Sequence, residues 1–247
     1  MNLQLNGKAV FVTGGTKGIG KAIAESFAAE GCKVAVCARH EVDNFSEDIP
    51  IILGDITKFE ERERIFKEVT ASIGPIDILI NNAGGSNGAE IEKTTLDDFH
   101  QAFELNYFSA VHFSKLVLPG MKANKEGAII QVSSIFGRES GGKATYNNAK
   151  AALISFTKAL ADEVMKEGIR VNSVAPGSIL HPTGNWQKRL DENPEKINNF
   201  VEANIPAGRF GTPEEIADVV VFMASSKASW VTGSSLQVDG GQSKMNM

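Results

Sequence analysis

The chain has 247 residues, of which 42% are hydrophobic, and a formal net charge of -5. This size fits one large domain or two small ones with a sizeable core. The charges are spread without acidic or basic blocks, so they give no electrostatic footprint for nucleic acid or for an anionic membrane surface, and we expect neither partner.

The first predicted elements are a strand, a glycine-rich turn and a helix. Residues 8–13 form an apolar run, glycines recur through 14–20, and 21–30 continues at helical spacing with Ile23 and Phe27 on one side. Glycine leaves the backbone bare, so amides at the start of the helix can meet a phosphate, where the helix dipole favours negative charge. The turn therefore predicts a pyrophosphate cradle, although glycines also close turns that bind nothing.

Strands and helices then alternate to the end of the chain. Thr95 with Asp98, and Thr212 with Glu215, form capping-box patterns that begin two of the helices. Repeated βα units with apolar strands predict a single α/β domain, residues 1–247, with a Rossmann-type doubly wound parallel sheet, helices on both faces and a ligand beyond the carboxyl ends of the strands. We expect a loop over 39–49, strands over 32–37, 50–54, 76–80, 127–132, 169–174 and 235–239, and helices over 59–73, from Thr95, over 144–166 and from Thr212.

Residues 178–205 interrupt this alternation. The segment is rich in Asn, Pro, Lys and Glu, and its apolar residues recur at roughly helical spacing: Trp186, Leu190, Ile197, Phe200 and Val201. An insertion of this length is usually functional, so we predict a substrate lid, with an ordinary surface excursion as the alternative.

Several features are missing from the sequence. No apolar run reaches membrane-spanning length and no signal peptide precedes the first strand, which predicts a cytoplasmic protein without membrane contact. Cys32 and Cys37 bracket one strand, which places them ~16 Å apart on opposite faces and excludes a disulfide between them. The four histidines lack ligand-like spacing, so no metal site is expected.

The ordered motifs of the chain resemble those of the classical short-chain dehydrogenase/reductase family, most closely its 3-oxoacyl-acyl-carrier-protein reductase-type members. The motifs are Thr13-Gly14-x-x-x-Gly18-Ile19-Gly20, Asn81-Asn82-Ala83-Gly84, Asn106, Ser134, Tyr146-x-x-x-Lys150 and Pro176-Gly177. The resemblance implies catalytic residues Asn106, Ser134, Tyr146 and Lys150. It implies cofactor contacts from Gly14, Gly15, Thr16, Lys17, Gly18, Ile19, Gly20, Arg39, Asp55, Ile56, Asn82, Ala83, Gly84, Tyr146, Lys150, Pro176, Gly177 and Ile179.

Tyr146 and Lys150 also suggest their chemistry directly. Four residues apart on one helix, they share a face. Bringing the pKa of a tyrosine from ~10 close to neutrality requires about 4 kcal/mol, and burial alone acts the wrong way. A lysine ammonium at ~4 Å in an effective dielectric of ~20 supplies about that much. We therefore predict that Lys150 lowers the pKa of Tyr146. If the pair stood alone, a core tyrosine and a solvated lysine would be the favoured interpretation, since this spacing is common by chance.

The other two catalytic candidates have simple alternatives. Ser134 follows the fifth strand and could donate to a substrate carbonyl oxygen, with Ser133 as the neighbouring choice. Asn106 lies inside the long helix from Thr95, where asparagine competes with helical hydrogen bonds, so it could face solvent or mark a kink. By resemblance it would instead hold a water that links Lys150 to bulk solvent.

Charge predicts the cofactor. NAD sites carry an acidic residue after the second strand, whereas a 2′-phosphate needs a cation there. Here Ala38 is followed by Arg39, and Lys17 adds a charge from the turn, which favours NADP. Either cation could be merely solvated. His181 stands where the family often has threonine, which leaves the carboxamide contact beside Ile179 open.

The sequence predicts an NADP-dependent oxidoreductase that interconverts a ketone and a secondary alcohol, with Tyr146 as general acid/base. The alternative is an NAD-dependent sugar or polyol dehydrogenase, and a non-catalytic NADP-binding protein ranks below both. A polar pocket of Gly85, Ser86, Asn87, Arg138, Glu139, His181 and Trp186 suits a hydroxylated or anionic small-molecule substrate. The family resemblance implies a homotetramer paired through the two long helices. Leu153, Phe156 and Leu160 are predicted to be covered by a partner or, alternatively, by the sheet.

Overall fold

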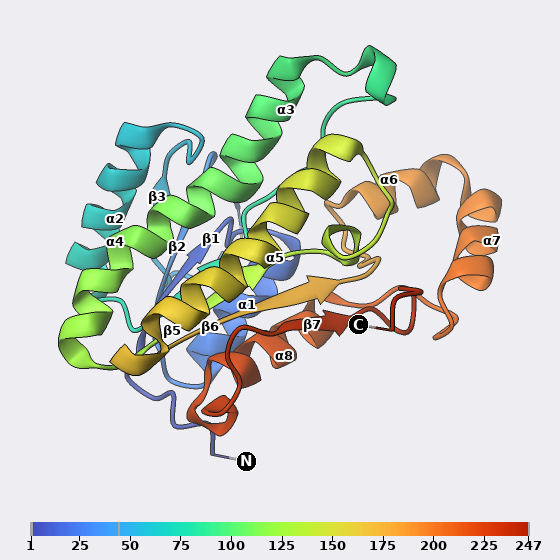
Figure 1. Ribbon diagram of the computed structural model, residues 1–247. Helices are drawn as coiled ribbons and strands as arrows, with labels where there is room; N and C mark the ends of the chain where they lie inside the picture. The colour runs from blue at the N-terminus through green and yellow to red at the C-terminus, as the bar shows by residue number, and fades with distance from the viewer. Residues whose placement is uncertain (1, 44, 247) are drawn as a thin grey trace.

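The computed structural model describes residues 2–43 and 45–246. Its centre is one seven-stranded sheet, parallel throughout, with the strand order β3-β2-β1-β4-β5-β6-β7 (Figure 1). The strands are β1 Ala9–Thr13, β2 Lys33–Ala38, β3 Ile51–Leu53, β4 Ile78–Asn81, β5 Gly127–Val132, β6 Ile169–Pro176 and β7 Ser235–Val238. The predicted doubly wound fold is confirmed.

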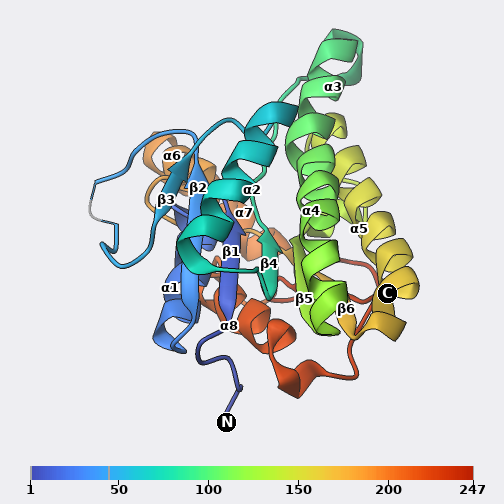
Figure 2. The same cartoon turned by 90° about the vertical axis from the view of Figure 1, so that its left-hand side faces the viewer.

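Helices cover both faces of the sheet (Figures 1 and 2). On one face lie α1 Gly18–Ala29 and α8 Pro213–Ala224, and on the other lie α2 Phe59–Ile73, α4 Ser109–Asn124 and α5 Ala144–Val164. Beyond the carboxyl ends of the strands, α6 Asn185–Glu192 and α7 Pro194–Asn204 project from the sheet. The remaining pieces are α3 Leu96–Phe103, a π-helical turn Glu104–Phe108, and 3₁₀ turns at Ile91–Lys93, Ile135–Gly137, Met165–Glu167 and Ser226–Ala228.

The sheet has one hydrophobic core on each face, because successive side chains along a strand point to opposite faces. In β1, Val10 and Val12 join the core under α1 and α8, whereas Phe11 joins the core under α2, α4 and α5. There its ring meets that of Phe113 edge-on, with 5.2 Å between centroids. Burial on both faces explains why β1 is apolar along almost its whole length. Cys32 and Cys37 likewise lie against opposite cores and are free thiols, as predicted.

Both predicted capping boxes are present. At α3 the Thr95 hydroxyl accepts from the N–H of Asp98 at 3.1 Å, and the Asp98 carboxylate accepts from the N–H of Thr95 at 2.9 Å. Thr212 and Glu215 make the same reciprocal pair at α8, with Pro213 as the first helical residue. Local hydrogen-bonding chemistry therefore sets these two helix starts.

The strand order determines at which edge of the sheet a ligand is expected to bind. After β3 the chain returns to put β4 beside β1, so the carboxyl ends of β1 and β4 meet at the reversal of strand order. The segments 39–43 and 45–50 contain no helix or strand, in agreement with the predicted loop. Within the described ranges, no helix is long and apolar enough to cross a bilayer.

Candidate active site

A cavity of about 850 Å³ opens at the carboxyl ends of the strands. Its walls come from the turn after β1, from the ends of β4, β5 and β6, and from α5 and α6. The predicted site residues that line it are Gly14, Thr16, Lys17, Gly18, Ile19, Gly20, Arg39, Ile56, Asn82, Ala83, Gly84, Ser134, Tyr146, Lys150, Pro176, Gly177 and Ile179. Gly15, Asp55 and Asn106 are not among the lining residues.

The glycine turn is held open by the end of β4. Gly14 and Gly18 have φ of 64° and 50°, the left-handed region that favours glycine. The Thr13 hydroxyl accepts from the N–H groups of Asn82 at 3.0 Å and Ala83 at 3.1 Å. The Asn82 amide donates to the carbonyls of Thr13 and Gly14, each at 3.0 Å. Asn82 therefore positions the turn, and the start of α1 faces the cavity.

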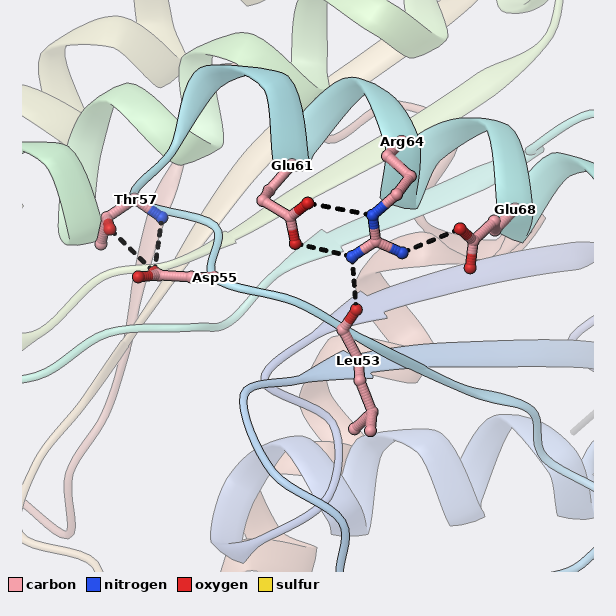
Figure 3. Close-up of polar contacts among 6 residues, drawn as sticks. All are labelled: Leu53, Asp55, Thr57, Glu61, Arg64 and Glu68. Carbon is pink, nitrogen blue, oxygen red and sulfur yellow. Dashed lines mark hydrogen bonds and ion pairs between the residues drawn. The ribbon is translucent and has the colours of Figure 1, made fainter.

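Two residues predicted to contact the cofactor, Gly15 and Asp55, make structural contacts. A β-carbon at Gly15 would lie 2.4 Å from Val36, so this glycine lets the turn pack on β2. The Asp55 carboxylate accepts from both the N–H and the hydroxyl of Thr57, at 3.0 and 2.7 Å (Figure 3). Beside it, the Arg64 guanidinium donates to the carbonyl of Leu53 at 2.6 Å and ties β3 to α2. These contacts hold Gly54 and Ile56 at the cavity wall.

Ser134, Tyr146 and Lys150 come together across α5 and the end of β5. Lys150 is 2% exposed, and its Nζ donates to the Val132 carbonyl at 2.7 Å and lies 5.6 Å from the centroid of the Tyr146 ring. The Ser134 hydroxyl is hydrogen-bonded to the Tyr146 hydroxyl. The hydroxyl of Ser133 points to β6 and donates to the Val174 carbonyl at 2.9 Å. Geometry thus favours Ser134 over Ser133 as the serine that meets substrate.

The pKa of Tyr146 lies above its ordinary value, and its causes do not include the predicted effect of Lys150. Burial raises the pKa of Tyr146, and the hydrogen bond from Ser134 lowers it only in part. Burial also lowers the pKa of Lys150 to about 8. Withdrawal from water therefore disfavours both the tyrosinate form of Tyr146 and the ammonium form of Lys150. The Lys150 ammonium donates a hydrogen bond to the Val132 carbonyl and not to the Tyr146 hydroxyl.

Asn106 lies in the π-helical turn, neither solvent-facing nor in a regular helix. It is 1% exposed, its amide donates to the carbonyls of Gly85 and Ala102, and its Oδ1 accepts from the N–H of Gly85 at 3.0 Å. A β-carbon at Gly84 would lie 2.7 Å from this Oδ1 and 3.2 Å from Lys150 Nζ. Asn106 therefore approaches Lys150 across a bare glycine backbone. Such π-bulges are frequent at functional sites.

The charged groups that line the cavity have one sign. Lys17, Arg39, Lys143, Lys150 and Arg189 line it together with His40 and His181, and no aspartate or glutamate of the described chain does. The whole chain is acidic, so this concentration of cations favours a ligand that carries several negative charges. A dinucleotide with a 2′-phosphate fits: the diphosphate at the start of α1, and the 2′-phosphate between Lys17 and Arg39.

The substrate side of the cavity differs from the prediction. Arg138 donates to the Ser235 carbonyl, Glu139 accepts from Ser243 and Lys244, and Asn87 is bonded to Asp98 and Thr145, so none of the three lines the cavity. Gly85, Ser86, His181 and Trp186 do, as predicted, and so do Phe136, Lys143, Asn185 and Arg189, which the sequence analysis missed. Sequence spacing could have indicated two of them, because Lys143 precedes Tyr146 by three residues and Arg189 follows Trp186 by three.

The described residues hold no cluster of His, Cys, Asp or Glu suited to a metal ion.

Three comparisons place the chain among known proteins. The family model described as enoyl-(acyl carrier protein) reductase matches residues 14–243. The 3-oxoacyl-acyl-carrier-protein reductase FabG of Vibrio cholerae is 39% identical over 97% of this chain and 98% of its own length. The acetoacetyl-CoA reductase of Shinella zoogloeoides is 36% identical over 95% and 98%. The crystal structure of L-sorbose reductase from Gluconobacter frateurii with NADPH and L-sorbose has a TM-score of 0.90 and 34% identity, covering 99% of this chain and all of that one.

Proposed function

The chain belongs to the short-chain dehydrogenase/reductase family, and on that premise we propose that it is an NADP-dependent reductase of a small polar ketone. The observation that carries this proposal is the grouping of Ser134, Tyr146 and Lys150 at the end of a cavity whose charged groups are all cationic. The relatives named as reductases, and the sorbose reductase structure with NADPH, support the same reaction.

Each residue has a role that its contacts support. NADPH, when bound, supplies the hydride that adds to the carbonyl carbon. Tyr146 donates its hydroxyl proton to the carbonyl oxygen, and Ser134, hydrogen-bonded to that phenol, donates to the same oxygen as charge develops on it. Lys150 orders the cofactor side of the pocket. Asn106, one glycine away, holds the proton path between Lys150 and solvent.

The pKa of Tyr146 favours the reductive direction. Because burial raises that pKa, the phenol is protonated at neutral pH and is ready to act as an acid. Oxidation of an alcohol would need the phenolate, which the same burial disfavours. The pKa shift therefore supports ketone reduction over alcohol oxidation at neutral pH.

The substrate class follows from the residues beyond Tyr146. Lys143 and Arg189 bring cations, and Ser86 and Asn185 bring hydrogen-bonding groups, to the part of the cavity near α6. The Arg189 guanidinium lies 5.1 Å from the centroid of the Trp186 indole, and that indole stacks on Phe200 of α7 with 4.8 Å between centroids. We propose that residues 178–205 form a lid and that the ketone carries hydroxyl or anionic groups for these side chains. L-sorbose and 3-oxoacyl thioesters are the two substrate types to compare first.

A homotetramer and a cytoplasmic location complete the proposal. Leu153 and Leu160 are buried within the chain itself, as the alternative to a covering partner predicts. A cavity between α4 and α5 remains, lined by Val111, Leu118, Phe156 and others, and it supports pairing of these helices between copies. Light scattering at micromolar concentration tests the tetramer. Two free thiols suit a reducing compartment, and cell fractionation tests that location.

The test of the reaction is the variant Tyr146→Phe with NADPH and a panel of polar ketones. We expect turnover to fall by about 10²-fold or more while NADPH still quenches or shifts protein fluorescence as in the parent enzyme. Tyr107→Phe is the matched control, since its ring packs among Phe103, Phe108 and Phe156 outside the cavity, and it should retain turnover. Near-normal turnover of Tyr146→Phe would refute the mechanism. Tight NADH binding with weak NADPH binding would instead restore the NAD-dependent sugar dehydrogenase.

A further inference from the structure

His181 lies against the glycine turn, at a place that the family-based prediction leaves open. A β-carbon at Gly18, the first residue of α1, would lie 2.7 Å from its Nε2. One at Gly184, just before α6, would lie 2.8 Å from the same atom. The imidazole is therefore sandwiched between the turn that opens α1 and the segment that opens α6.

The backbone around His181 is fixed. Ile179 forms a β-bridge with Gly211, and the N–H of Leu180 donates to the Gly211 carbonyl at 3.0 Å. The N–H of Gly184 donates back to the His181 carbonyl at 2.9 Å, which closes a turn. The ring itself is oriented by the Thr183 hydroxyl, 3.3 Å from Nδ1. With Nδ1 engaged there, Nε2 is left to face the start of α1.

The start of α1 is where an anionic group of the cofactor is expected to bind. The first residues of α1 line the cavity, and the helix dipole favours negative charge there. Nε2 of His181 lies at that same position and can donate a hydrogen bond to a phosphate oxygen, more strongly when the ring is cationic. We propose that His181 is a ligand of the cofactor diphosphate in this chain and that protonation of its ring strengthens NADPH binding. The inference rests on the proposed cofactor.

The charged groups around the ring make it sensitive to the ligand. The turn before α1 contributes Lys17 to the cavity, and α6 contributes Arg189; both are cations. Asp239 packs near Gly177 of the preceding segment, but its carboxylate accepts from the N–H groups of Gly241 and Ser243. Among the described residues no carboxylate is left to stabilise an imidazolium in the cavity, so the diphosphate is the anion that can do so.

The sign of the pH dependence follows from these surroundings. Burial lowers the pKa of His181 below its ordinary value, so the ring is neutral in the free protein at neutral pH. A bound diphosphate favours the cation and raises that pKa. Between the two pKa values binding takes up a proton, so affinity increases as pH falls and levels off once the free protein is itself protonated.

The experiment is a fluorescence titration with NADPH from about pH 8 to about pH 6, comparing the parent protein with His181→Gln. We expect the dissociation constant of the parent to fall about tenfold more over this range than that of the variant, since one linked proton allows at most tenfold per pH unit. The 2′-phosphate of NADPH also titrates near pH ~6, but it does so with both proteins and cancels in the comparison. His100→Gln, which removes an exposed histidine of α3 that does not line the cavity, should keep the parent's slope.

A second readout follows the ring directly. The NMR resonance assigned to His181 by its loss in His181→Gln should report a pKa that rises when NADP is added. Equal pH slopes in the parent and His181→Gln, or a pKa that falls on binding, would overturn the inference. So would tighter NADPH binding by His181→Ala at every pH, because the ring would then be only an obstruction. Absence of NADPH binding at any pH overturns the proposed cofactor and this inference together.

Discussion

We expect Lys150→Met to raise the free energy of unfolding at neutral pH, although it removes a residue of the active site. Lys150 is 2% exposed, and burial lowers its pKa from the usual 10.5 to about 8. This difference corresponds to about 3 kcal/mol of destabilisation while the side chain is charged. Methionine has a similar shape and no charge. It loses the hydrogen bond to the Val132 carbonyl, which is worth roughly 1–1.5 kcal/mol, so the net gain at pH 7 is about 2 kcal/mol.

The pH dependence of that gain separates desolvation from packing. A lysine whose pKa is lowered in the folded state costs stability fully below the folded pKa, about 8, progressively less as pH rises, and nothing above the unfolded value of 10.5. Urea unfolding of both proteins between about pH 7 and about pH 10.5 should therefore show the advantage of Lys150→Met shrinking to zero or reversing. Ketone reduction should be lost throughout. A variant that is less stable at pH 7, or a pH-independent difference, would refute the reasoning.

Four further predictions test other contacts. Asn106→Ala leaves the N–H and carbonyl of Gly85 without partners and should cost about 3 kcal/mol in urea unfolding together with most activity; an unaffected rate would remove Asn106 from the site. Arg39→Ala should weaken NADPH binding roughly 10–100-fold and leave NADH binding unchanged, and equal losses for both would place the 2′-phosphate elsewhere. The rate of ketone reduction should fall as pH rises above about 8, where Lys150 loses its proton while Tyr146, whose pKa burial raises, remains protonated; a rate that rises instead would contradict this assignment. Thr212→Ala should cost about 1 kcal/mol of stability with no change in turnover, since it removes one half of a capping box whose residues do not line the cavity.

The sequence predicts elements whose causes are local. The runs of β-branched residues, the two capping boxes and the separation of Cys32 from Cys37 depend on chemistry within a few residues, and the structure agrees with each. The π-helical turn at Asn106 could not be found this way, because its side chain bonds to Gly85, a residue of the β4 loop that only the tertiary fold brings near. The periodicity of the apolar residues predicts a continuous helix through this part of the chain.

Tertiary contacts also explain why some predicted site residues do not line the cavity. Arg138 follows Ser134 closely in the chain, yet its guanidinium donates to the Ser235 carbonyl of β7, which pairs with β6. Asp55 lies at the expected position after β3, but Thr57, two residues on, satisfies its carboxylate. Sequence spacing locates the loop that carries a side chain, whereas the partner that the side chain meets depends on strands far away in the chain.

The pKa values of Tyr146 and Lys150 connect the stability of this protein to the direction of its reaction. An ammonium directed at the phenol oxygen would lower the pKa of Tyr146, but Lys150 donates to a backbone carbonyl and burial disfavours both charged forms. The fold therefore tolerates an unfavourably buried cation and keeps the tyrosine protonated. A protonated phenol beside Ser134 can act as a general acid. It can protonate the oxygen of a carbonyl group, on which negative charge develops as hydride adds to the carbonyl carbon. The burial that destabilises the chain at neutral pH is the same burial that favours the reductive direction in the proposed mechanism.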